Sequence, residues 1–173
     1  RQRQMCIRDR FIPLSVLEME VEHLNKRDLH RIKETRICFP LNDVCCDPVK
    51  NVLALFLSEV LFRGVKDTEP DPRLFDYLYE SIHLLEYADK GIANFHMVFL
   101  LGLLHHLGIF PNMESHRVGY YFDMLNGVFT DHIPMHRHYL NKVESAFFSR
   151  LLRISFENMS LYGFSRQERA RII

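Results

Sequence analysis

The spacing of hydrophobic and polar residues changes near residue 47. Before that point, Leu17–Glu22 alternates apolar and acidic residues without a break, which is typical of a half-buried β-strand. A polar turn at 25–28 follows, and Leu29–Phe39 is predicted to be a second, less regular strand. Because two strands do not form a stable sheet alone, this pair needs further strands that the chain does not supply.

After residue 47 the apolar spacing becomes helical. Asp47 suits the N-cap of a helix and Pro48 its first position, and Asp71 with Pro72 repeats this signal. The expected buried face of the first helix consists of Val49, Val52, Leu53, Phe56, Val60 and Leu61. That of the second helix consists of Leu74, Phe75, Leu78, Ile82 and Leu85, with Gly91 as its C-terminal breaker.

The third predicted helix, Ile92–Leu107, is apolar on nearly every side, which indicates a central buried helix. Residues 112–138 lose the helical spacing, and Asn126-Gly127 predicts the turn of a small hairpin. Two further helices are predicted at Leu140–Ile154 and Phe156–Gly163. The expected fold class is therefore mainly α, with a short β segment in front.

The composition limits the classes of protein to which the chain can belong. Hydrophobic residues make up 47% of the chain and the formal net charge is zero, so nucleic-acid binding would need a local basic patch. The most apolar run, Met97–Leu104, is too short to cross a bilayer, and no membrane partner is expected. The four cysteines form no CxxC pair, which favours reduced thiols and a cytoplasmic protein; they are Cys6, Cys38, Cys45 and Cys46.

Candidate catalytic groups are few. His132, His136 and His138 have the density of a metal site, but Pro134 lies among them and no HExxH pattern is present, which favours solvated loop histidines. Nucleophile-elbow, Walker and dinucleotide-binding patterns are absent from the sequence. The chain is therefore predicted not to be an enzyme and to hold no metal or other cofactor, with a histidine-based metal-dependent hydrolase as the alternative.

Basic residues gather in and after the turn of the strand pair. On spacing alone, a solvated face and a nucleic-acid contact fit this cluster equally well. The cluster consists of Lys26, Arg27, Arg31, Lys33 and Arg36.

Several segments, in this order, resemble the RecO family of bacterial DNA-repair proteins. They lie at residues 13–23, 27–36, 47–63, 69–78, 94–112 and 121–130. Arg1–Arg10 fits no pattern of the chain and is taken as a non-native segment. The resemblance implies that the remainder is a C-terminal fragment: residues 11–45 as the tail and linker of a truncated oligonucleotide-binding (OB) barrel, and residues 46–173 as the helical RecO domain.

The resemblance also implies a function and partners. RecO proteins are recombination mediators that bind single- and double-stranded DNA, anneal strands and help RecA to replace the single-strand-binding protein SSB. RecR is an expected partner, and the acidic, apolar SSB tail is an expected ligand. The basic cluster would contact DNA, and the tail would need an apolar pocket with a cationic rim. That rim would come from Lys50 and Arg63, or from Arg150 and Arg153. A generic helical adaptor without DNA affinity is the other alternative.

The zinc site of the family is not expected here. Family members often carry four cysteines after a turn that corresponds to Gly108–Pro111. No cysteine occurs at Glu114–Val118 or after the Asn126-Gly127 turn, as in the version found in Bacteroidetes-type bacteria. Apolar packing of Tyr121, Phe122 and Phe129 would take the place of the metal.

Overall fold

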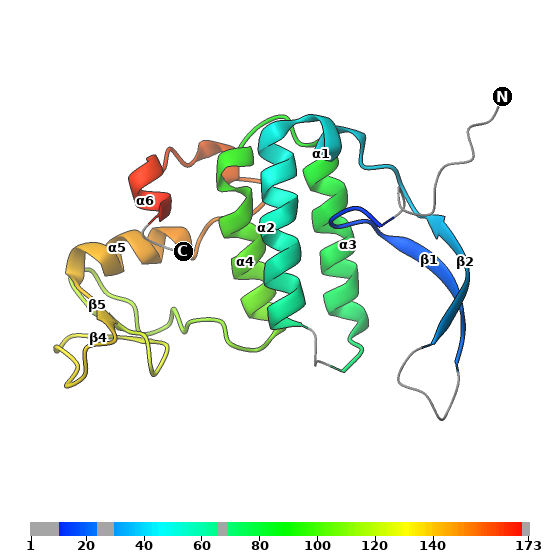
Figure 1. Cartoon of the computed structure of the whole chain (residues 1–173). Helices are drawn as coiled ribbons and strands as arrows, with labels where there is room; N and C mark the ends of the chain where they lie inside the picture. The colour runs from blue at the N-terminus through cyan, green and yellow to red at the C-terminus, as the bar shows by residue number, and fades with distance from the viewer. Residues whose placement is uncertain (1–10, 24–29, 66–68, 171–173) are drawn as a thin grey trace. The chain divides into compact units, whose positions relative to one another are not determined.

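A computed structural model describes residues 11–23, 30–65 and 69–170 (Figure 1). The chain divides between Ala88 and Asp89 into two compact units, called unit 1 and unit 2 below. Unit 1 holds strands β1 and β2 and helices α1, α2 and α3; unit 2 holds α4, three short strands, α5, a 3₁₀ turn and α6. Helices dominate both units, as the sequence predicts.

Strands β1 (Leu17–Glu22) and β2 (Arg31–Ile37) pair antiparallel and form the predicted two-stranded ribbon. Leu17 pairs with Ile37, but the register shifts after Glu20, and Lys33 is the extra residue of a β-bulge. A bulge changes which face the following side chains occupy. It therefore places Ile32 beside Val21 on the apolar face, and it explains why β2 lacks the strict alternation of β1.

Helices α1 (Asn42–Cys46), α2 (Pro48–Gly64) and α3 (Pro72–Tyr87) complete unit 1. The predicted helix starts are confirmed. The Asp47 carboxylate accepts hydrogen bonds from the backbone N–H groups of Val49 and Lys50 at 2.7 and 3.0 Å, and Asp71 accepts one from Arg73. These N–H bonds lower the pKa of Asp47. Helix α1 was not predicted.

The predicted buried face of α2 is wrong at its first two positions, while Leu53, Phe56, Val60 and Leu61 are half-buried. Val49 and Val52 are 56% and 64% exposed, whereas the buried residues of α2 are Lys50, Ala54 and Leu57. Because apolar residues occupy nearly every side of this helix, their spacing does not distinguish one face from another. Phe75 of α3 is also exposed, at 57%.

Helix α4 (Ile92–His106) is the predicted buried helix, and Phe95, Met97 and Phe99 are almost inaccessible. The role predicted for Gly91 is wrong, since α3 already ends at Tyr87 and Gly91 is the N-cap of α4. Its φ of 75° lies in the left-handed region, and a Cβ atom there would lie 2.8 Å from Cγ of Met159. A glycine is therefore required by both conformation and space.

The predicted hairpin is confirmed, with β3 (Tyr121–Asp123) paired to β4 (Val128–Thr130) across a turn that contains Gly127 at a φ of 66°. A third strand, β5 (Tyr139–Leu140), pairs with the other edge of β3 and was not predicted.

The C-terminal region contains α5 (Lys142–Leu151), the 3₁₀ turn η2 (Met159–Leu161) and α6 (Arg166–Ala170). A capping box of Asn141 and Glu144 starts α5. The predicted helix at Phe156–Gly163 is wrong, because this segment forms turns and η2. The side chain of Asn158 accepts a hydrogen bond from the Ser155 N–H and donates one to the Arg153 carbonyl, which competes with helical hydrogen bonding.

Candidate functional site

The cations of the ribbon lie at its surface. Arg31, Lys33 and Arg36 are exposed, while Lys26 and Arg27 lie outside the described residues. Lys33 lies 4.0 Å from Glu20, and Arg36 pairs with Glu34 at 3.0 Å. The hydrogen bond and charge of Glu34 raise the pKa of Arg36. Strands β1 and β2 together carry three basic and four acidic residues, so this part of the basic cluster has no positive excess.

Lys50 belongs to the interior of unit 1. Its ammonium group donates a hydrogen bond of 2.6 Å to the backbone carbonyl of Glu86 and lies 3.6 Å from the Asp43 carboxylate. The buried Glu86 carboxylate in turn accepts hydrogen bonds from the backbone N–H groups of Asp43 and Val44. Lys50 and Glu86 thus join α1, α2 and α3, and the Lys50 ammonium is already engaged within the fold.

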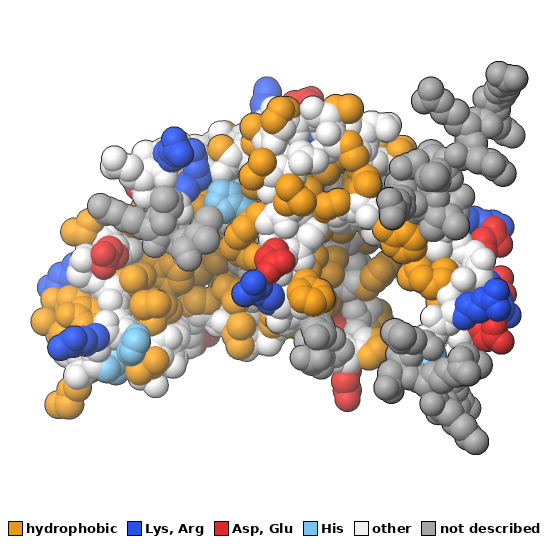
Figure 2. Space-filling view, viewed as in Figure 1, with side chains coloured by type: hydrophobic (Ala, Val, Ile, Leu, Met, Phe, Trp, Pro, Cys, Tyr) orange, Lys and Arg blue, Asp and Glu red, His pale blue; other side chains and the backbone are white. Residues whose placement is uncertain are grey.

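Arg63 lies on an exposed apolar face of α2. This face, called the α2 stripe below, consists of Val49, Val52, Leu55 and Phe62, each more than half exposed. Figure 2 shows apolar side chains gathered over α2, with acidic and basic side chains among them. The side chains of Arg63 and Glu59 approach each other to 2.6 Å, one helical turn apart. The stripe therefore combines apolar area with an exposed cation.

Arg150 and Arg153 are exposed near the end of α5. The Arg150 guanidinium lies over the ring of buried Phe164, 5.7 Å from its centre. Arg169 of α6 donates a hydrogen bond to the backbone carbonyl of the same residue. Arg150 and Arg169 therefore gather at one aromatic residue, and neither forms an ion pair with a carboxylate in the described part of the chain.

The hairpin of unit 2 is held by aromatic rings and by one carboxylate. The ring centre of Phe122 lies 4.9 Å from that of Phe129 and 4.6 Å from that of Phe148, and Tyr121 is half-buried. The Asp123 carboxylate accepts hydrogen bonds from the Leu125 and Asn126 backbones and from the Asn126 side chain. It also lies 3.2 Å from His136, and this set, led by the Asn126 side chain, lowers its pKa to about 2.

The histidine cluster does not assemble. His132 is exposed and pairs with Asp131, whereas His136 contacts Asp123, and the ring centres of His136 and His138 are 6.3 Å apart. Over the described residues, no three His, Cys, Asp or Glu side chains are grouped so that they could hold a metal ion. Cys38, Cys45 and Cys46 are free thiols.

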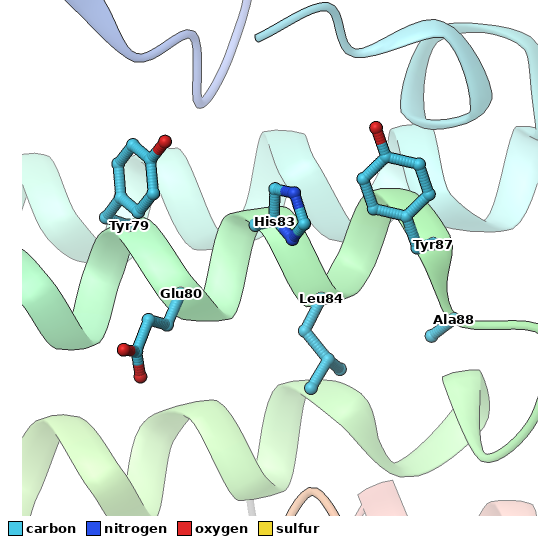
Figure 3. A pocket seen from close by; sticks show the side chains of 6 residues that line it. All are labelled: Tyr79, Glu80, His83, Leu84, Tyr87 and Ala88. Carbon is cyan, nitrogen blue, oxygen red and sulfur yellow. The ribbon is translucent and has the colours of Figure 1, made fainter. Parts of the chain in front are cut away.

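A pocket on α3 was not predicted from the sequence. Figure 3 shows Tyr79, His83 and Tyr87 above the helix and Glu80, Leu84 and Ala88 below it. Together these six side chains line a pocket of about 500 Å³. Its signal in the sequence is a series of aromatic residues four positions apart. That signal was hidden because Phe75, the first of them, was predicted to lie on the buried face.

The described surfaces offer exposed cations, apolar side chains and an aromatic pocket, which is typical of a protein that binds other macromolecules. None of the described helices is both long and apolar enough to cross a membrane. Comparison with known proteins identifies the family. Residues 46–173 match the family model described as recombination protein O C terminal.

Curated relatives named "DNA repair protein RecO" match nearly the whole chain. The protein of Azobacteroides pseudotrichonymphae is 39% identical over 94% of this chain and 68% of its own length. That of Phocaeicola vulgatus is 38% identical over the same shares, and that of Flavobacterium psychrophilum is 32% identical over 92% and 65%. The chain belongs to the RecO family, in agreement with the resemblance seen in the sequence. No solved structure matches it.

Proposed function

We propose that the chain acts in DNA repair as a non-catalytic recombination mediator. The observation that carries this proposal is membership of the RecO family, with relatives named as DNA repair proteins over 94% of the chain. In this role the chain would bind single- and double-stranded DNA, promote annealing, and act with RecR to load RecA onto SSB-coated single strands. The β1–β2 ribbon would be the end of an OB barrel, which is consistent with its exposed apolar face.

The proposed DNA contact is the basic cluster of the ribbon. Arg31, Lys33 and Arg36 are exposed, and Lys26 and Arg27 of the intervening turn would add two further cations. The ion pairs of Lys33 and Arg36 do not exclude this role. Exposed pairs contribute roughly 0–1 kcal/mol, so a phosphate can compete with Glu20 or Glu34 for the same cation.

The proposed contact for the SSB tail combines apolar area with a cation. The α2 stripe and Arg63 meet both requirements in unit 1, and Arg150 with Arg153 supplies cations in unit 2. Lys50 is omitted from the proposed contact because its ammonium is buried and hydrogen-bonded. An acidic tail that places an apolar side chain on the α2 stripe would displace Glu59 from Arg63.

The test is fluorescence anisotropy with a labelled single-stranded oligonucleotide and a labelled SSB tail peptide. The variant with Arg31, Lys33 and Arg36 all changed to glutamine is expected to bind DNA more weakly, with a salt slope smaller by about 0.7 for each phosphate that is no longer neutralised. Arg63→Gln should weaken binding of the SSB tail peptide and leave binding of the oligonucleotide unchanged. Arg137→Gln, an exposed cation outside both sets, is the control.

Three outcomes would reject the proposal. DNA binding that is unchanged in the triple variant would remove the ribbon as its contact. A chain that binds no DNA at any salt concentration would be a helical adaptor. Hydrolysis that disappears with a chelator and returns with zinc would support the histidine-based enzyme instead.

A further inference from the structure

Four aromatic side chains follow one another along α3 at intervals of four residues. They are Phe75, Tyr79, His83 and Tyr87, called the aromatic row below. Residues four apart lie on the same side of a helix, one turn from each other. The ring centres of His83 and Tyr87 are 4.7 Å apart and those of Phe75 and Tyr79 are 6.3 Å apart, so the rings form a nearly continuous surface.

One further ring supports the middle of this surface. Phe39, which follows strand β2, meets Tyr79 and His83 edge-on, with ring centres 5.3 and 5.2 Å away. The end of the row remains open, because Tyr87 is 61% exposed and His83 is also exposed. A supported aromatic surface that remains open to solvent is typical of an interaction site.

The pocket beside the row is an open depression of about 500 Å³. All the side chains that line it belong to α3 or to Ala88, which follows the helix directly. Tyr79, His83 and Tyr87 form one wall, and Leu84 and Ala88 contribute apolar area to the other (Figure 3). Glu80 contributes a carboxylate to the lining of the pocket.

The acidic residues and aromatic rings of this surface favour a positively charged ligand. No lysine or arginine is among the residues that line the pocket. The exposed carboxylates of Glu80 and Asp76 form no ion pair with any cation that the structure describes. The faces of aromatic rings carry partial negative charge and attract lysine or arginine. A phosphate or an acidic peptide would be repelled, so the ligands of the proposed function do not fit here.

We propose that the aromatic row and the pocket beside it bind a basic segment of a partner protein. An arginine or lysine side chain of that segment lies over the Tyr87 and His83 rings, and its charge is balanced by Glu80. The apolar stem of the same side chain contacts Leu84 and Ala88. This surface is independent of the proposed contacts for DNA and the SSB tail.

The experiment uses the whole chain and a short fluorescein-labelled peptide in which arginines alternate with glycines. Tyr87→Phe keeps an aromatic ring, whereas Tyr87→Leu keeps apolar area and loses the ring. We expect Tyr87→Leu to bind the peptide about three- to fivefold more weakly and Tyr87→Phe to stay within about twofold of the original chain. Glu80→Gln should weaken binding and reduce its dependence on salt. Glu114→Gln, an exposed carboxylate outside α3, is the control for net charge.

Thermal unfolding of each variant checks that the fold is retained, which the exposure of Tyr87 and Glu80 favours. Equal peptide affinity for Tyr87→Leu, Glu114→Gln and the original chain would overturn the proposal, as would a failure of the original chain to bind the peptide. A loss of oligonucleotide binding in Tyr87→Leu without a loss of peptide binding would also overturn it, because the row would then stack nucleic-acid bases.

Discussion

Buried polar groups join helical elements in both units, but the two junctions differ in chemistry. In unit 1, the charged side chains of Lys50 and Glu86 connect α1, α2 and α3. In unit 2, the neutral amide of Asn94 donates hydrogen bonds of 2.9 and 2.8 Å to the backbone carbonyls of Met159 and Tyr162, and Gly91 lets η2 approach the start of α4. Each junction satisfies backbone groups that a helix leaves without partners or that a turn exposes.

The difference shows how charge in a sequence can mislead. Lys50 is a natural candidate for a ligand contact because a lysine is normally exposed, yet its ammonium group serves the same structural purpose as the Asn94 amide. Removal of the Glu86 carboxylate leaves two backbone N–H groups without a charged acceptor, and a hydrogen bond to a charged group contributes more than one between neutral groups. The two junctions should therefore respond unequally to substitution.

The largest effect is expected for Glu86→Ala. It removes the carboxylate that accepts the Asp43 and Val44 N–H groups and leaves both without their acceptor. We expect the free energy of unfolding to fall by about 3–5 kcal/mol, because each hydrogen bond to a charged group contributes roughly 1.5–3 kcal/mol. Urea denaturation followed by circular dichroism measures this change. Glu80→Gln on the exposed side of α3 is the control and should stay within about 0.5 kcal/mol. Similar values for both variants would mean that the junction contributes no stability.

A smaller effect is expected for Gly91→Ala in unit 2. The new Cβ would meet Cγ of Met159 at 2.8 Å and the backbone nitrogen of Ser160 at 3.0 Å, in a left-handed backbone conformation. Gly108→Ala is a matched control, because its φ of 73° is similar and nothing lies within 4 Å of the added atom.

Conformational strain alone costs roughly 1–2 kcal/mol, which is the loss expected for Gly108→Ala. Gly91→Ala should lose about 1 kcal/mol more, because Met159 or the η2 backbone has to move. Thermal unfolding of the two variants gives this difference directly. If the two melting temperatures agree, the close approach of η2 does not restrict residue 91.

Local signals made much of the fold predictable. The Asp-Pro pairs located the starts of α2 and α3, and Asn126-Gly127 located the hairpin, because each depends on residues adjacent in sequence. The buried face of α2 depends on Lys50 meeting Glu86, which is 36 residues away. The spacing of apolar residues within α2 therefore cannot predict which of its faces is buried.

The candidate sites were also predictable only where local sequence was sufficient. Exposed cations such as Arg63 could be named from the sequence, but their pairing with Glu59 and the apolar area around them required the structure. The pocket on α3 follows an interval of four residues and was visible in principle. Its edge-on support by Phe39 comes from a segment 40 residues before Tyr79, and helical spacing does not reveal that packing.

The smallest effect concerns the buried carboxylate of Asp123 in the hairpin of unit 2. The Asn126 side chain, with the Asn126 and Leu125 backbones and His136, holds the pKa of Asp123 at about 2, below its usual value of about 3.9. A carboxyl group with a lowered pKa in the folded state contributes stability that is fully present above about pH 4 and is lost as the pH falls toward 2. Asp123→Asn removes the titrating group, and it places an amide N–H₂ where the Asn126 side chain and His136 meet a carboxylate. The variant should therefore melt at a lower temperature than the original chain at pH 6, and the difference should shrink steadily as the pH falls from about 4 to 2. Asp131→Asn is the control. The pKa of Asp131 is also lowered, mainly by the side chain of His132, but Asp131 is exposed.

Melting curves at several pH values measure both variants. A difference for Asp123→Asn that stays constant down to pH 2 would show that the charge of Asp123 does not hold the hairpin turn.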